Sequence, residues 1–192
     1  MTRFVTEFTE ALNSSIQPYL DIKAYIDHDR LSPGYKYNGA LAQAICESVC
    51  MVAIVVPKYF NHEYCLQELA TMEKIQDART RKIGQNALGN RGLIIPVVLR
   101  GKIENLPEKM SQHIHCCDFS DFNTACRKVH KIMPYIREIE KIAEYIYDLY
   151  KIFNQHSAVK NFKCEQFTFA NNNMMKTWQP KNTTPPSPFY GA

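Results

Sequence analysis

The feature that most constrains this chain is Met51–Val56 (MVAIVV), an apolar run without a single polar residue. A strand of this kind must be covered on both faces, which is typical of a parallel sheet with helices on either side. A second such run, Leu93–Leu99, follows a long stretch with helical patterning. The sequence therefore predicts an α/β protein with a doubly wound parallel sheet.

The remaining elements fit the same alternation. Phe4, Phe8, Leu12 and Ile16 recur at helical spacing, which predicts a helix over residues 3–16. Further expected elements are a short strand at Lys23–Ile26, helices from Leu41 to Ser48 and from Glu63 to about Ala78, an edge strand at His115–Phe119 and a helix from Phe122. Ligands of such sheets lie beyond the carboxyl ends of the strands, so the loops after Ile26 and Val56 are where chemistry is expected.

The last third of the chain reads as an appendage. Pro134 predicts the first turn of a new helix that runs to about Phe153. Its apolar seam is expected to cover the sheet or the tail, and a dimer contact is the alternative. From Asn154 onward Asn, Thr and Pro dominate, which predicts a mostly disordered tail over 154–192. Trp178 and Phe189-Tyr190 are candidate docking anchors within it. The expected organisation is thus a domain at 1–133, a helix at 134–153 and the tail.

Charge and cysteine content narrow the class of protein. The net charge of +4 is small and both signs are interspersed, so no nucleic-acid partner is expected. The seven cysteines follow no disulfide-framework spacing, and we expect free thiols in a reducing, cytoplasmic setting. Neither a signal peptide nor an apolar run long enough to cross a membrane is present, so no membrane association is expected. His113, His115, Cys116 and Cys117 have the composition of a metal site, but neighbouring strand residues point to opposite faces and no metal is predicted.

Four matches in order resemble the Toll/interleukin-1 receptor (TIR) domain family. Tyr25-Ile26-Asp27 is similar to the family's second strand, and Leu31-Ser32-Pro33-Gly34 to the BB loop after it. Ile45–Tyr59 is similar to its helix–strand run, and Tyr64-Cys65-Leu66-Gln67-Glu68-Leu69 to its Trp-Cys-x-x-Glu-Leu box. The resemblance covers roughly residues 3–150 and implies the flavodoxin-like TIR fold.

The resemblance also implies chemistry, because the family includes NAD+-cleaving enzymes acting in signalling and immune defence. Glu68 occupies the position at which these enzymes have their catalytic carboxylate. The resemblance therefore implies an NAD+ glycohydrolase that takes NAD+ as its substrate and needs no cofactor. Tyr64 is expected to stack on a flat ring and Cys65 to line the same wall, with Asp27, Pro33 and Gly34 as further substrate-binding residues. Hydrolysis and cyclisation of NAD+ are both open. The ordinary alternative is that Glu68 is a surface residue and Tyr64 a core residue.

Two other functions compete with this one. The first is a non-enzymatic adaptor that binds other TIR domains, or its own copies, through the Leu31–Gly34 loop. The second, more distant one is a nucleoside-processing enzyme of similar fold, for which the sequence has no dedicated motif.

The sequence departs from the family pattern in several places. Tyr64 replaces the usual Trp, Pro57 stands where Ser is frequent, and His62 stands where a small residue is common. The family's opening strand is missing, since Met1-Thr2-Arg3-Phe4 already matches the helix after it. A chain start assigned too late is the favoured explanation. The alternatives are an impaired product and a replacement strand, for which Phe162–Ala170 is the candidate.

Overall fold

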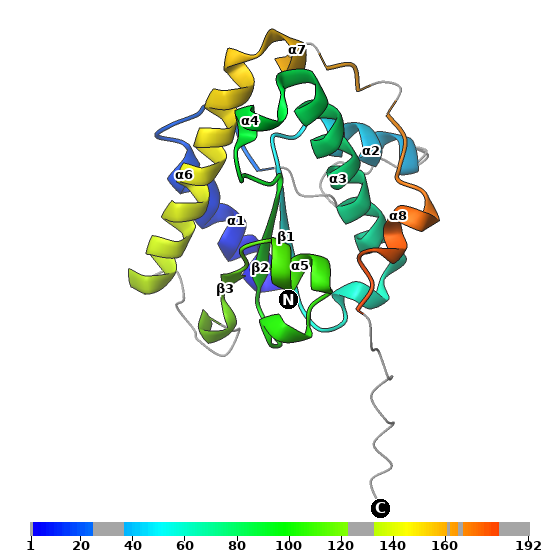
Figure 1. Ribbon diagram of the computed structural model, residues 1–192. Coiled ribbons are helices and arrows are strands. Elements are labelled where there is room, and N and C mark those ends of the chain that lie inside the picture. Colours follow the sequence, from blue (N-terminus) through cyan, green and yellow to red (C-terminus); the bar gives the residue numbers. More distant parts are fainter. Residues whose placement is uncertain (1, 25–36, 123–132, 161, 165–166, 181–192) are drawn as a thin grey trace, which may run out of the picture.

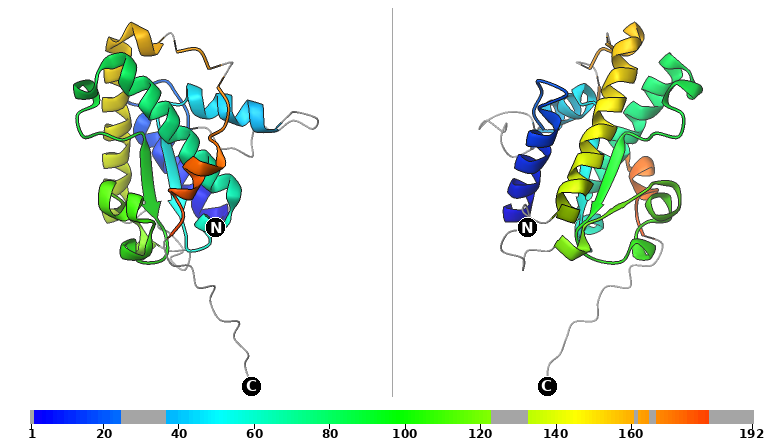
Figure 2. Two further views of the ribbon diagram at one scale, coloured as in Figure 1. Left: turned by 45° about the vertical axis from the view of Figure 1, so that its right-hand side comes forward. Right: turned by 90° about the vertical axis from the view of Figure 1, so that its left-hand side faces the viewer.

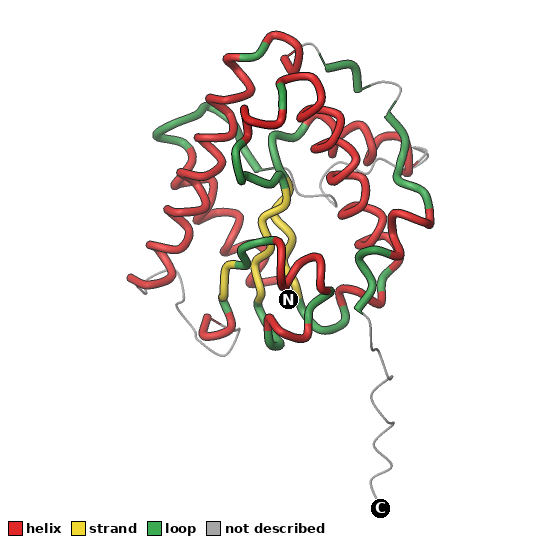
Figure 3. Tube along the Cα trace, viewed as in Figure 1, coloured by secondary structure: helices red, strands yellow, loops and turns green. Residues whose placement is uncertain are grey.

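A three-stranded parallel sheet forms the centre of the computed structural model, surrounded by helices (Figure 3). The strands are β1 (Met51–Val55), β2 (Ile94–Val98) and β3 (Cys117–Asp118), in the order β1-β2-β3. Met51 is paired with Ile94, and Val97 with Cys117. The structure describes residues 2–24, 37–122, 133–160, 162–164 and 167–180 (Figure 1). The parallel pairing of the three strands and the helices around them confirm the predicted α/β class.

Four predicted helices are present with shifted ends, several short helices were not predicted, and the helix expected from Phe122 lies outside the described residues. The helices are α1 (Thr2–Ile16), α2 (Tyr37–Glu47), α3 (Glu63–Ile83), α4 (Gln85–Leu88), α5 (Glu108–His113), α6 (Met133–Gln155), α7 (Ser157–Lys160) and α8 (Asn172–Lys176). Single 3-10 turns occur at Tyr59–Asn61, Ile103–Asn105 and Ser120–Phe122. α3 ends at Gly84, whose φ of 88° is a conformation that glycine adopts without strain. Pro134 lies in the first turn of α6, as predicted.

Alternate residues of the two long strands face two separate halves of the core. Ile94 and Val98 face the half that contains α3, whereas Ile95 and Val97 face the half that contains α1 and α6. α1 lies against α6 on that second side, and the turned views separate the layers (Figure 2). The predicted C-terminal helix is therefore a covering layer of the sheet, which explains its apolar seam.

The described residues after α6 differ from the expected disordered tail, whereas 181–192, with Phe189-Tyr190, lie outside the described residues. α7, α8 and the described residues between them lie over α3, and Trp178 has only 1% of its surface exposed. Cys164 in this region forms a disulfide with Cys46 of α2. The expectation of seven free thiols is therefore wrong for this pair, because cysteines 118 positions apart are brought together by tertiary packing that their spacing does not reveal.

β1 forms one edge of the sheet within the part of the chain that the structure describes. In the family that the sequence resembles, a further strand ahead of the first helix lies in the centre of the sheet. Phe162–Ala170 does not fill the slot, because its described residues are irregular and lie against α3. The predicted strand Lys23–Ile26 extends beyond the described residues after Ala24, and Lys23 and Ala24 themselves are not in a strand.

Candidate functional site

The box from Tyr64 to Leu69 lies in the first two turns of α3, which follows the carboxyl end of β1. The connection is a short loop and the single turn Tyr59–Asn61, so α3 begins at the edge of the sheet where its strands end (Figure 1). The loop after β2 meets the loop after β1 there, since a Cβ on Gly101 would lie 3.5 Å from Pro57 Cγ. In open parallel sheets this edge carries the ligand site.

Glu68 is half-buried on α3 and interacts electrostatically with Cys65 and Tyr59. Burial and then Glu68 raise the pKa of the Cys65 thiol to about 11. Burial, followed by Cys65 and Glu68, raises the pKa of Tyr59 well above its ordinary value. Both neighbours therefore stay protonated at neutral pH, so neither places a second negative charge beside Glu68.

Tyr59 is a site residue that the sequence analysis did not select. It lies four positions after the apolar strand and five before Tyr64, and its ring contacts that of Phe60 at 5.4 Å between centroids. A polar aromatic that directly follows a buried strand in an α/β protein is a usable signal, because such positions lie at the ligand-binding edge.

Tyr64 has 56% of its surface exposed and lies one turn before Glu68 on the same helix. Exposure of a large aromatic side chain at this position contradicts the alternative that Tyr64 is a core residue. His62 is the N-cap residue of α3 but makes no side-chain capping hydrogen bond. Asp27, Pro33 and Gly34 lie outside the described residues, so the loop that contains them remains a prediction.

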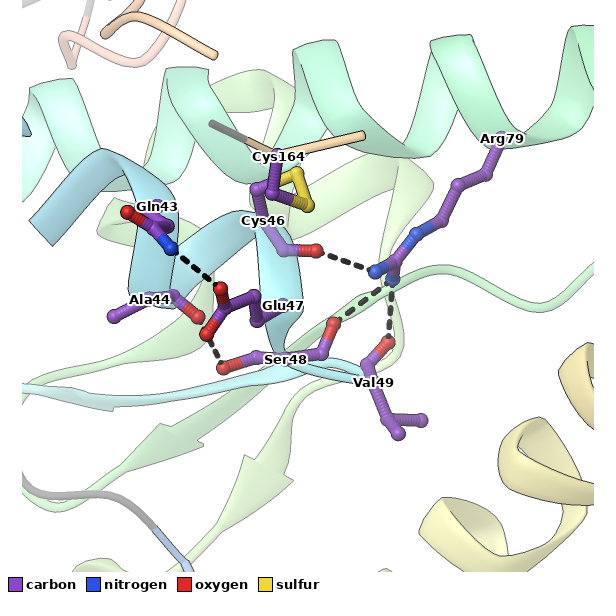
Figure 4. The surroundings of a disulfide bond; sticks show 8 residues. All are labelled: Gln43, Ala44, Cys46, Glu47, Ser48, Val49, Arg79 and Cys164. Atoms are coloured by element: carbon purple, nitrogen blue, oxygen red, sulfur yellow. Dashed lines mark hydrogen bonds between the residues drawn. A yellow bond between two sulfur atoms is a disulfide. The ribbon is translucent and has the colours of Figure 1, made fainter. Parts of the chain in front are cut away.

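The far half of α3 is fixed by Arg79, one of the few buried charged residues. Its Nη1 donates hydrogen bonds of 2.9 and 3.3 Å to the carbonyl oxygens of Ser48 and Val49, and its Nη2 donates one of 2.6 Å to Cys46 (Figure 4). The guanidinium also lies 4.9 Å from the centre of the Phe153 ring. Arg79 thus satisfies carbonyl groups at the carboxyl end of α2 and joins α2, α3 and α6.

Among the residues described, no three His, Cys, Asp or Glu side chains come together in a way that would hold a metal ion. In the same part of the chain, no helix combines the length and the apolar character that crossing a membrane requires. A shallow hollow lined by Asn171, Asn172 and Asn173 lies at the start of α8, and none of the predicted site residues lines it.

Comparison with known proteins gave one match. A family model described as TIR domain matches residues 2–132, which includes α1 to α5 and all three strands but ends before α6. Neither the curated proteins nor the solved structures gave a match to the chain.

Proposed function

Because this chain belongs to the TIR domain family, we propose that it cleaves NAD+ between nicotinamide and ribose, with Glu68 as its catalytic carboxylate. The observation that carries the proposal is the position of Glu68. It lies on the helix that begins where β1 ends, one turn after the exposed Tyr64, and it interacts electrostatically with the protonated Cys65 and Tyr59. TIR domains act in signalling and immunity, and some cleave NAD+.

Cleavage of the bond between nicotinamide and ribose requires few protein groups besides a carboxylate. When the bond from C1′ to the nicotinamide nitrogen breaks, both electrons pass to nicotinamide, which leaves as a neutral molecule and needs no general acid. The ribose acquires oxocarbenium character, as in glycoside hydrolysis. A fixed carboxylate stabilises this positive charge and orients the ribose hydroxyls. Water then bonds to C1′ and loses a proton, giving ADP-ribose. Attack by another part of the same nucleotide gives a cyclic product instead.

We assign the remaining site residues to substrate binding. Tyr64 stacks on a flat ring of NAD+ and Cys65 lines the wall beside it. Asp27, Pro33 and Gly34 contribute from the loop that the family resemblance places next to the pocket. Members of the family that cleave NAD+ become active on self-assembly, so we also propose that contacts between copies, through the Leu31–Gly34 loop, control the activity.

The test is nicotinamide release from NAD+ by concentrated protein, measured by chromatography. We expect release by the natural sequence and none above background for Glu68→Gln, which keeps the size of the side chain and removes its charge. Glu63→Gln is the matched control, since Glu63 is an exposed carboxylate on the same helix. Far-UV circular dichroism checks that both variants are folded.

The result of this assay distinguishes the NAD+ glycohydrolase from the adaptor. Release that persists in Glu68→Gln would overturn the assignment of this residue. Absence of release from every protein, at concentrations where copies associate, would favour the adaptor function over the enzyme.

A further inference from the structure

We propose that residues 162–164 and 167–178, here called the strap, form a redox-controlled cover of α3. In this proposal the Cys46–Cys164 disulfide holds the strap closed, and reduction of that bond lets it open. The inference goes beyond the proposed function and does not depend on NAD+ cleavage. The strap lies entirely outside the part of the chain that the TIR family model matches.

The strap covers the outer side of the helix that carries Glu68. Thr71 of α3 is fully buried beneath it, and its Oγ1 accepts a hydrogen bond of 3.0 Å from the backbone N–H of Ala170. The same hydroxyl donates to the carbonyl oxygen of Gln67 at 2.6 Å. Lys74 donates from Nζ to the carbonyl oxygen of Thr168 at 3.1 Å and lies 4.9 Å from the centre of the Phe167 ring. These contacts fall within two turns of Glu68.

The end of the strap is held by the single tryptophan of the sequence. Trp178 donates from Nε1 to Glu73 Oε2 at 3.1 Å, and Lys109 of α5 forms an ion pair with Glu73 and lies 4.9 Å from the centre of the Trp178 ring. The strap therefore also contacts α5, which lies beside the strand ends (Figure 1).

Between these anchors the strap has little regular structure and several exposed residues. Lys163, Thr168, Lys176 and Thr177 are exposed, and the only regular structure among the strap residues described is the short α8. Four of the strap's side chains are buried, and four more are partly buried against the same core: Cys164, Ala170, Met175 and Trp178, and then Phe162, Phe167, Phe169 and Met174. Because the strap has little regular structure of its own, we expect it to open locally at a lower free energy than global unfolding, and a covalent bond to the rest of the molecule opposes that opening.

The disulfide joins the strap to α2. Cys46 is fully buried near the end of α2, and its own carbonyl oxygen accepts the 2.6 Å hydrogen bond from Arg79 (Figure 4). Cys50, one turn further along the chain, has a thiol whose pKa burial raises to about 12. Its thiol is therefore protonated at neutral pH and is a poor nucleophile for exchange with a disulfide.

In this proposal a dithiol reduces the Cys46–Cys164 disulfide. The S–S bond between Cys46 and Cys164 breaks and accepts two electrons, and each sulfur takes up one proton. The dithiol loses two electrons and two protons and closes to a disulfide. The bond that forms again on oxidation is the same one, provided that the strap has returned to α3.

The test follows the strap directly in the full chain. Mass spectrometry of digested, unreduced protein is expected to yield a peptide pair linked through Cys46 and Cys164. After dithiothreitol, we expect amide exchange at Ala170 to accelerate at least about tenfold, which corresponds to about 1.4 kcal/mol of lost protection. Acrylamide quenching of Trp178 fluorescence is expected to increase in the same samples. Amides of β2 and α1 should keep their slow exchange.

Two variants provide the controls. Cys164→Ser should exchange at Ala170 as fast as the reduced protein and should not respond to dithiothreitol. Cys117→Ser, which removes a free cysteine from β3, should retain the full response. Three results would each overturn the proposal: no linked peptide pair, unchanged Ala170 exchange after complete reduction, or loss of protection in β2 and α1 together with the strap.

Discussion

Arg79 Nη2 lies 2.6 Å from the carbonyl oxygen of Cys46, a residue 33 positions earlier whose sulfur is bonded to Cys164. One residue of α2 is thereby fixed twice, through its backbone by α3 and through its side chain by the strap. The two attachments are independent chemically, since one is a charge-assisted hydrogen bond and the other is covalent. Each can be removed without touching the other.

Replacing Arg79 should therefore destabilise the protein with the disulfide intact. Arg79→Met keeps much of the buried side chain but leaves the carbonyl groups of Cys46, Ser48 and Val49 without this donor. We expect the free energy of unfolding to fall by about 3 kcal/mol, since each buried polar group left unsatisfied costs about 1–3 kcal/mol. Urea unfolding gives the value. Arg81→Met, at an exposed position two residues later, should change it by less than about 0.5 kcal/mol, and equal effects in both variants would contradict this role.

Alkaline pH should weaken the fold through its buried thiols. Burial raises the pKa of Cys50 from 9.0 to about 12 and that of Cys117 to about 11, so the folded chain holds these protons more tightly than the unfolded chain. The resulting stability is fully present below about pH 9 and is lost as the pH rises from about 9 towards 12. In Cys50→Ala, urea unfolding at several pH values should show a smaller decline over this range. Parallel declines in the two proteins would contradict the shift at Cys50.

Substitution of Tyr64 should affect substrate binding and leave stability almost unchanged. Because the side chain is 56% exposed, Tyr64→Ala removes little buried surface. Loss of one stacked ring is worth about 1–3 kcal/mol, so the KM for NAD+ should rise about tenfold or more. Tyr64→Phe keeps the ring and should stay close to the natural sequence. A KM that is equal in Ala and Phe variants would exclude stacking at this position.

Association between copies of the chain should depend on the Leu31–Gly34 loop. The family resemblance assigns contacts between copies to the Leu31–Gly34 loop, which lies outside the described residues. Gly34→Pro fixes φ and removes a backbone donor, so it should reduce oligomer size more than it reduces the unfolding midpoint. Light scattering and thermal unfolding measure the two quantities. An unchanged oligomer would indicate that contacts form through another surface.

Most of the fold could be predicted because burial leaves a direct mark on sequence. The run at Met51–Val56 is apolar throughout since β1 lies between two helical layers, and Pro134 marked the start of α6 by its missing N–H. The packed strap was not predicted, because its polar residues outnumber the few side chains that it buries. The apolar side chains that pack against the core, Trp178 and Cys164 among them, follow no helical or strand periodicity that would reveal it.

The candidate site likewise has residues that local spacing reveals and residues that only tertiary packing brings together. Tyr64, Cys65 and Glu68 are neighbours on one helix, so local spacing places them together, and the structure agrees. Tyr59 joins them only because the turn after β1 folds back onto α3, and Arg79 contacts α2 only through tertiary packing. Asp27, Pro33 and Gly34 remain predictions from resemblance.

The disulfide also determines how the molecule responds to force. It closes a covalent ring that runs from Cys46 to Cys164 and contains all three strands together with α3 and α6. Tension applied to the two chain ends passes through the sulfur atoms and bypasses everything inside the ring. Pulling can therefore extend α1, α2 and the part of the strap after Cys164 without extending the backbone of the strands. An unfolding machine that draws the chain in from one end would meet the same barrier until the bond is reduced.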